Sequence, residues 1–91
     1  MTMDAAARAA KAEEVFVALL RKFTAQKQMV SPSPSSTYAP ARFAEHSEAQ
    51  GFSKKEFRTA MQRLLDIKTI EIRTWGKPSK PIRYLAVVGE G

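Results

Sequence analysis

The sequence predicts an α+β fold in which three helices are followed by one small antiparallel β-hairpin. Three patterns support this prediction: apolar residues at helical spacing near the N-terminus, a helix-start signature at Ser53, and two β-rich runs separated by a proline-containing loop. The chain has 91 residues, which is the size of a single domain with one hydrophobic core.

The first helix is expected from Met1 to about Gln26. Asp4 is suited to cap it, and its second half carries apolar residues about 3.6 positions apart, which form one buried stripe. The stripe consists of Val15, Phe16, Leu19, Leu20 and Phe23. Residues 1–12 are rich in alanine and have little to bury. We interpret them as a helix start, as a linker, or as a surface for a partner helix.

The second helix is expected from about Ala39 to Gln50, after a polar loop over residues 31–37. The two prolines of the loop exclude a helix there, whereas Pro40 suits the first turn of the helix that follows. Gly51 is expected to end this helix in the left-handed conformation. Tyr38 is expected to anchor the loop at the helix start, with stacking on a nucleobase as the alternative.

The third helix has the clearest local signature, and it is expected from Lys54 to Asp66. Ser53 is its N-cap and Glu56 completes a capping box, while Phe52 and Phe57 form the matching hydrophobic staple. Only three residues separate it from the second helix, as in a helix-turn-helix. Its core-facing residues are Phe57, Ala60, Met61, Leu64 and Leu65.

Two strands are expected after the third helix. Residues 69–74 alternate between apolar and charged side chains, with Ile70 and Ile72 toward the core. Residues 75–81 contain two prolines, a glycine and two lysines and therefore form a loop. Residues 82–88 form the returning strand, with its alternate positions on opposite faces.

This order of elements is that of a winged helix-turn-helix: three helices with a small antiparallel β-hairpin wing. Met29 and Val30 are suited to a third, very short strand. The winged-helix domain is assigned to residues 13–88, and residues 89–91 form a tail.

The positive charge is concentrated in residues 53–83. This segment contains nine lysines and arginines against three acids, a net +6 that equals the formal charge of the whole chain. The sequence pI is near 10, which favours a polyanionic partner: DNA, RNA or an acidic protein surface.

The composition argues against several classes of function. The chain has no cysteine, which excludes disulfides and thiolate sites, and its single His46 lacks the partners of a metal or catalytic site. The four glycines are scattered, so there is no phosphate-binding loop. We therefore expect no catalytic residue, metal or cofactor. No segment approaches the roughly 20 apolar residues of a membrane span, and no signal peptide is evident; we expect a soluble, cytoplasmic protein.

The candidate DNA contacts lie on the third helix and on the hairpin. On the helix, the side opposite the core carries residue types that reach base edges and phosphates in the major groove. These are Lys54, Lys55, Arg58, Thr59 and Gln62. On the hairpin, a stiff basic tip is suited to phosphate contacts. Its candidates are Arg73, Trp75, Lys77, Lys80 and Arg83. The alternatives are a solvated helix face and a solubilising loop. Trp75 itself is expected to pack back on the domain, with stacking on an unpaired base as the alternative.

The chain also resembles a known family over most of residues 12–75. The matching segments are Val15-Phe16-Val17-Ala18-Leu19-Leu20, Phe23-Thr24-Ala25-Gln26, Ser31-Pro32-Ser33-Pro34, Tyr38-Ala39-Pro40, Phe43-Ala44, Lys54-Lys55, Ala60-Met61 and Leu64-Leu65. They are similar to the winged-helix segment at the C-terminus of plasmid- and prophage-encoded replication ATPases of the RecA-like hexameric helicase type. The resemblance implies an upstream ATPase core and a DNA-binding or regulatory role for this segment.

The sequence thus predicts a winged-helix domain that binds double-stranded DNA. One alternative is a protein-interaction module, which forms a homodimer or packs on a parent ATPase without DNA affinity. The other is a single-stranded nucleic-acid binder in which Trp75 and Tyr38 stack on bases.

Overall fold

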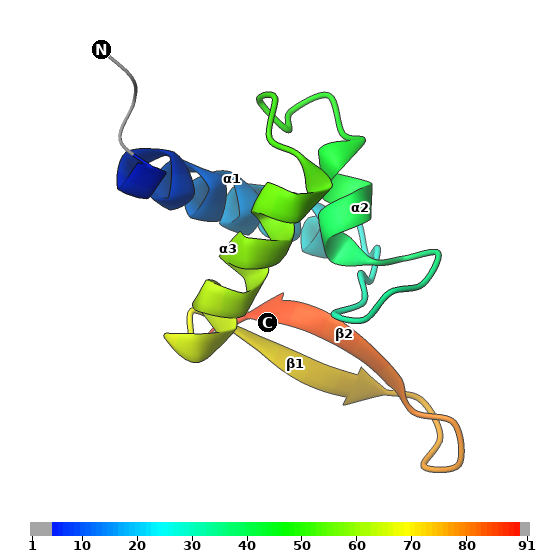
Figure 1. Cartoon of the computed structure of the whole chain (residues 1–91). Coiled ribbons are helices and arrows are strands. Elements are labelled where there is room, and N and C mark those ends of the chain that lie inside the picture. Colours follow the sequence, from blue (N-terminus) through cyan, green and yellow to red (C-terminus); the bar gives the residue numbers. More distant parts are fainter. Residues whose placement is uncertain (1–4, 90–91) are drawn as a thin grey trace.

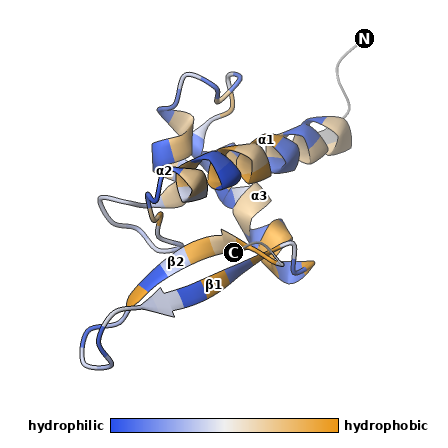
Figure 2. Cartoon of the chain, turned by 180° about the vertical axis from the view of Figure 1, so that it is seen from behind, coloured by the Kyte–Doolittle hydropathy of each residue, from blue (hydrophilic) through white to orange (hydrophobic). Residues whose placement is uncertain are grey.

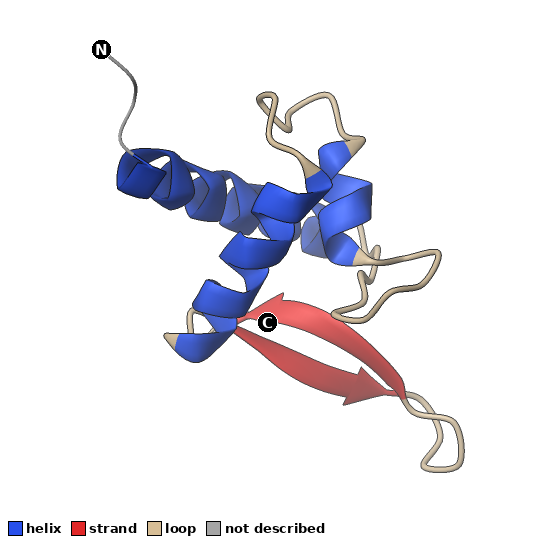
Figure 3. Cartoon of the chain, in the orientation of Figure 1, coloured by secondary structure: helices blue, strands red, loops and turns tan. Residues whose placement is uncertain are grey.

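The chain folds into three helices and a two-stranded antiparallel hairpin (Figures 1 and 3). A computed structural model describes residues 5–89. The elements are α1 (Ala5–Ala25), α2 (Ala39–Ala44), α3 (Lys54–Asp66), β1 (Ile70–Trp75) and β2 (Ile82–Val87). The predicted α+β class, with three helices and one hairpin, is confirmed. In Figure 1, α3 crosses α1, and the hairpin extends beyond the helices toward the lower right.

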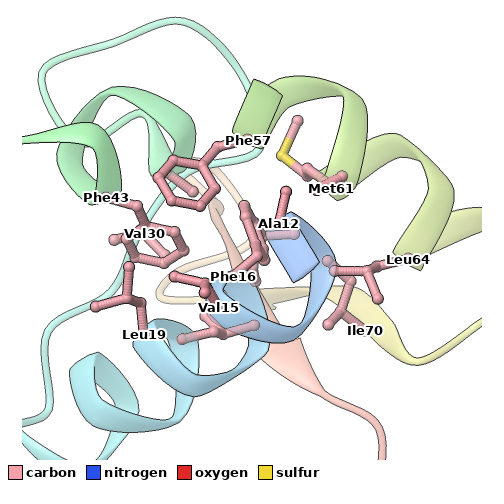
Figure 4. Close-up of a cluster of buried hydrophobic side chains, with 14 of the residues drawn as sticks. Ala12, Val15, Phe16, Leu19, Val30, Phe43, Phe57, Met61, Leu64 and Ile70 are labelled. Atoms are coloured by element: carbon pink, nitrogen blue, oxygen red, sulfur yellow. The ribbon is translucent and has the colours of Figure 1, made fainter. Parts of the chain in front are cut away.

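The core forms where α1, α2 and α3 meet, and it is built around three phenylalanines. The rings of Phe16 and Phe43 meet edge to face with centroids 4.8 Å apart, and the ring of Phe57 approaches both (Figure 4). All three side chains are fully buried. The predicted stripe of α1 is confirmed, since its five apolar residues are all buried. The expected Asp4 cap lies outside the described residues.

The expected extent of α2 is wrong. The helix ends at Ala44, and residues 45–51 form turns in which Gln50 and Gly51 both have positive φ. The imidazole Nδ1 of His46 accepts the backbone N–H of Glu48 at 3.0 Å, so a local turn competes with the helix here. Gly51 is therefore not the helix end, and the connection to α3 is longer than a tight helix-turn-helix turn.

The start and end of α3 are as predicted. The Glu56 backbone N–H donates to Ser53 Oγ at 3.2 Å, and the Ser53 N–H donates to Glu56 Oε1 at 3.0 Å. The capping box is thus complete, and the Phe52 and Phe57 rings lie 5.8 Å apart as a hydrophobic staple. Local side-chain chemistry fixes where this helix begins.

The hairpin is buried only at the end that meets the helices. Ile70 pairs with Val87, and Trp75 pairs with Ile82 at the other end. β2 packs on α1, and β1 packs on α3. Ile70 is 1% exposed, whereas Ile72 on the same strand face is 46% exposed, so the expectation that Ile72 belongs to the core is wrong. Figure 2 shows that the loop joining the strands is hydrophilic.

The short third strand predicted at Met29 and Val30 does not form in the described chain. Instead, Val30 is buried, and its carbonyl accepts one backbone hydrogen bond from Leu85 N–H at 3.0 Å. An isolated bridge joins Ser31 to Tyr38. The segment after α1 is therefore attached to the outer edge of β2 at a single point, which places it beside the hairpin.

Candidate nucleic-acid interface

The outer face of α3 carries three of the predicted contact residues. The buried residues of the helix are Phe57, Ala60, Met61 and Leu64. Since each residue turns an α-helix by about 100°, Lys55, Thr59 and Gln62 lie on the opposite side, and all three are exposed. The Thr59 hydroxyl donates to the Lys55 carbonyl at 3.2 Å. Asp66 lies on the same face, so this surface is polar but not uniformly positive.

Lys54 and Arg58 lie on the flank of α3 that faces α2. The Lys54 ammonium is 5.6 Å from the centre of the Tyr38 ring, which is a cation–π distance. Tyr38 is only 6% exposed, as expected of a residue that anchors the loop to the helix. A nucleobase has no open face of this ring to stack on, so the alternative role of Tyr38 as a stacking residue is wrong. Lys54 and Arg58 themselves remain exposed.

The opposite flank of α3 is joined to α1 by ion pairs. Arg8 forms two hydrogen bonds to the Glu56 carboxylate, at 2.5 and 3.0 Å, and its guanidinium lies 4.7 Å from the Phe52 ring centre. Arg8 and the Ser53 N–H together lower the pKa of Glu56 to about 2. Arg63 pairs with Glu13 at 3.2 Å. This flank is electrically balanced, so only the outer and α2-facing sides of α3 offer uncompensated cations.

Three of the hairpin cations have no ion-pair partner among residues 5–89. These are Lys77, Lys80 and Arg83, and all are exposed. Arg73 differs from them because its Nε donates to Glu71 at 2.7 Å, which compensates its charge. The predicted basic tip is therefore present without Arg73. In the tip, Lys80 N–H donates to the Lys77 carbonyl at 2.9 Å, which closes the turn.

Two stretches of sequence without any acid meet at the hairpin. Residues 15–44 and residues 72–89 contain no Asp or Glu, although each contains four lysines and arginines. Contact between α1 and β2, and the Leu85–Val30 hydrogen bond, bring the two stretches together. The acids of the described chain lie elsewhere, on the first half of α1, after α2, on α3 and at the start of β1. Lys22 and Arg73 are nevertheless paired with Glu48 and Glu71, so the positive charge on the hairpin side comes mainly from Lys27, Lys77, Lys80 and Arg83.

Trp75 lies beside this basic surface and is 60% exposed. The expectation that it packs back on the domain is wrong for most of its surface. It borders a groove of about 370 Å³ between the hairpin and the segment after α1. The groove is lined by Thr24, Lys27, Gln28, Met29, Trp75, Tyr84 and Leu85. No local sequence pattern marks Lys27 or Tyr84 as a neighbour of Trp75, because only the tertiary fold brings them together.

No family model, curated protein or solved structure matches the chain. Within the described residues, no cluster of three or more His, Cys, Asp or Glu is arranged to hold a metal ion. None of the helices over residues 5–89 is both long and apolar enough to cross a bilayer.

Proposed function

We propose that the chain is a winged-helix domain that binds double-stranded DNA, with α3 in the major groove and the hairpin as the wing on the phosphate backbone. The observation that supports this most is a set of exposed cations that have no acidic partner among residues 5–89. They lie at two separate places, Lys55 and Arg58 on α3 and Lys77, Lys80 and Arg83 on the wing. Uncompensated cations supply the sequence-independent part of DNA affinity.

The two elements have different roles in this proposal. Lys55 and Gln62 on the outer face of α3, with Arg58 on its flank, are the side chains that reach base edges. Lys54, Lys77, Lys80 and Arg83 bind phosphates and set the register of the domain on the duplex. Arg73 is assigned to hairpin stability because it already pairs with Glu71.

The resemblance to replication ATPases of plasmids and prophages supports a second part of the proposal. We propose that it is an accessory domain that holds such an ATPase on DNA and contributes no catalytic residue itself. The proposal depends on the resemblance and on the basic surface together.

A charge-neutralised pair of variants tests the duplex-binding function. K55Q/R58Q removes two cations from the proposed interface, whereas K11Q/R63Q removes one cation from α1 and one from the α3 flank that faces α1, so both variants have the same net charge. Fluorescence anisotropy with a labelled duplex should show at least a tenfold loss for the first and little change for the second. Equal affinities for the two variants would show that α3 does not contact DNA.

One observation favours a protein-interaction module as the second candidate. Ile67, Ile72 and Val88 are 54%, 46% and 45% exposed around the junction of α3 and the hairpin, and one edge of β1 has no partner strand in the described chain. A free strand edge with apolar neighbours is a common site for pairing with another chain. The alanine-rich first half of α1 is the other surface suited to a second copy or to a parent ATPase. Light scattering separates this candidate from the first: a dimer without duplex affinity supports it.

A further inference from the structure

The groove beside Trp75 is formed by two segments that are distant in sequence. The segment after α1 supplies Lys27 and Met29, and the hairpin supplies Trp75 and Tyr84. The hydrogen bond between Leu85 N–H and the Val30 carbonyl holds the first segment against β2. The groove therefore lies between two segments that this bond joins.

The hairpin wall presents two aromatic rings on one strand face. In the register of the hairpin, Trp75 pairs with Ile82, and Arg73 pairs with Tyr84, so Trp75 and Tyr84 are diagonal neighbours. Trp75, Ile82 and Met29 are 60%, 45% and 40% exposed, which makes this an open apolar surface. An exposed aromatic ring with apolar neighbours is suited to stack on a flat aromatic ligand.

The surroundings of the groove are cationic. Lys27 lines it, and Lys77 and Lys80 lie in the loop that follows Trp75. None of the three makes an ion pair in the part of the chain that the structure describes, and both stretches that form the groove lack acids. A ligand that is aromatic and also carries anionic groups on either side matches both properties.

The turn that ends α1 sets the position of Lys27 beside the groove. The end of α1 is a Schellman motif, in which Gln28 N–H donates to the Phe23 carbonyl at 2.9 Å. The motif requires a positive φ, which is +59° at Lys27, and glycine is the residue that usually occupies this place. A lysine there is strained, yet it puts a cation at the rim of the groove.

From these observations we propose that the groove binds an unpaired base of single-stranded DNA, which stacks on Trp75 while Lys27 and the two wing lysines contact the flanking phosphates. A duplex cannot supply this ligand, because its bases are stacked on one another. The inference rests on the proposed DNA-binding function and extends it: the wing lies at the end of a duplex, where one strand leaves the helix and crosses the groove.

The only tryptophan of the chain is Trp75, so its fluorescence reports directly on this groove. Oligothymidylate should quench the emission, whereas a blunt duplex at equal saturation and inorganic polyphosphate should change it little. Quenching of the same size by polyphosphate would overturn the inference, because it would show that charge alone perturbs Trp75. An emission unchanged by oligothymidylate would overturn it as well.

Substitution of Trp75 gives an independent test, in which fluorescence anisotropy measures the affinity for labelled oligothymidylate. W75A should lose roughly five- to 150-fold in affinity, the range that follows from losing one aromatic–base stack, and W75F should retain most of it. W75A should lose much less affinity for a blunt duplex than for oligothymidylate. If W75A binds oligothymidylate as tightly as wild type, the groove is not the site.

The two proposals fail in distinguishable ways. If K55Q/R58Q weakens duplex binding but oligothymidylate leaves Trp75 unaffected, the duplex function stands and the groove proposal fails. If oligothymidylate binding depends on Trp75 but no variant of α3 alters duplex binding, the groove proposal stands and the proposed role of α3 in duplex binding fails.

Discussion

The Arg8 guanidinium forms two hydrogen bonds with the Glu56 carboxylate and joins the first half of α1 to the first turn of α3. Glu56 therefore serves two purposes, since the same carboxylate closes the capping box with Ser53. The α-helix dipole also favours an acid in this first turn. The alanine-rich start of α1 is thus attached to the domain: α1 runs unbroken through residues 12 and 13, where the sequence suggested a linker boundary.

Replacement of Glu56 by glutamine should produce a pH-dependent loss of stability. Glutamine still fits a capping box, so E56Q removes mainly the charge, at a cost of under about 1 kcal/mol at pH 7, since the pair is partly exposed. The folded-state pKa of Glu56 is about 2, below its ordinary value of 4.5. The stabilisation is therefore complete above pH 4.5 and is lost as the pH falls toward 2.

Urea denaturation of wild type and E56Q across this pH range checks the prediction. The difference in free energy of unfolding should be constant from pH 5 to 8 and should shrink below pH 4.5. A difference that persists unchanged at pH 2 would mean that the charge of Glu56 is not the cause.

Loss of the Ser53 cap should cost about 1 kcal/mol, because S53A leaves the Glu56 backbone N–H without its acceptor. S79A, in the exposed loop between the strands, is the matched control and should stay within about 0.5 kcal/mol of wild type. Chemical denaturation measures both, and equal effects for the two variants would contradict the assignment of the cap.

Ile70 and Ile72 lie on the same face of β1, but Ile70 is 1% exposed and Ile72 is 46% exposed, so they allow a controlled comparison. I70A should destabilise the domain by about 2–5 kcal/mol, because it leaves a cavity in the core. I72A should cost under about 1 kcal/mol, since little buried surface is lost. Thermal unfolding followed by circular dichroism ranks the two, and a larger effect for I72A would contradict the described burial.

The salt dependence of duplex binding should fall when wing cations are removed. The logarithm of affinity should fall with the logarithm of salt concentration with a slope of about −0.9 per phosphate neutralised. K77Q/K80Q should make this slope shallower by about 2 if each lysine contacts one phosphate. Titrations at several salt concentrations measure it, and an affinity of wild type that does not change with salt would exclude phosphate binding altogether.

Lys27 and Lys68 occupy equivalent strained positions, because each lies at positive φ in the turn that ends a helix. Thr69 N–H donates to the Leu64 carbonyl at 2.9 Å, which is the same Schellman bond that follows α1. K27G and K68G should each stabilise the fold by up to about 1 kcal/mol. Only K27G should weaken binding of oligothymidylate, because only Lys27 lines the Trp75 groove. Equal binding by the two variants would remove Lys27 from the site.

The parts of the fold that the sequence predicted well depend on short-range chemistry. The start of α3 is set by contacts among residues 52–57, and all of them can be read from neighbouring side chains. The predicted extent of α2 was wrong because the hydrogen bond from Glu48 N–H to His46 favours a turn, and the helix ends earlier than the composition of residues 39–50 suggests. Composition reports propensity, and a local turn can override it.

The candidate site was predicted less completely, because its details depend on tertiary contacts. Residue types identified the basic tip and the outer face of α3, but they did not reveal that Arg73 is paired with Glu71. The neighbours of Trp75 come from a segment that only the fold brings near. A pattern of charges in a sequence cannot distinguish a compensated cation from a free one.

The bond between Leu85 N–H and the Val30 carbonyl has a consequence for motion in the hairpin. The hairpin is held at its inner end by this bond and by buried Ile70, while its outer end carries no buried side chain. Amide hydrogen exchange should therefore be slow at Leu85 and fast in the loop that joins the two strands. The outer end of the hairpin can therefore move while the helices keep a single shape. In the proposed complex, this would let its tip follow phosphate positions that differ from one DNA to another.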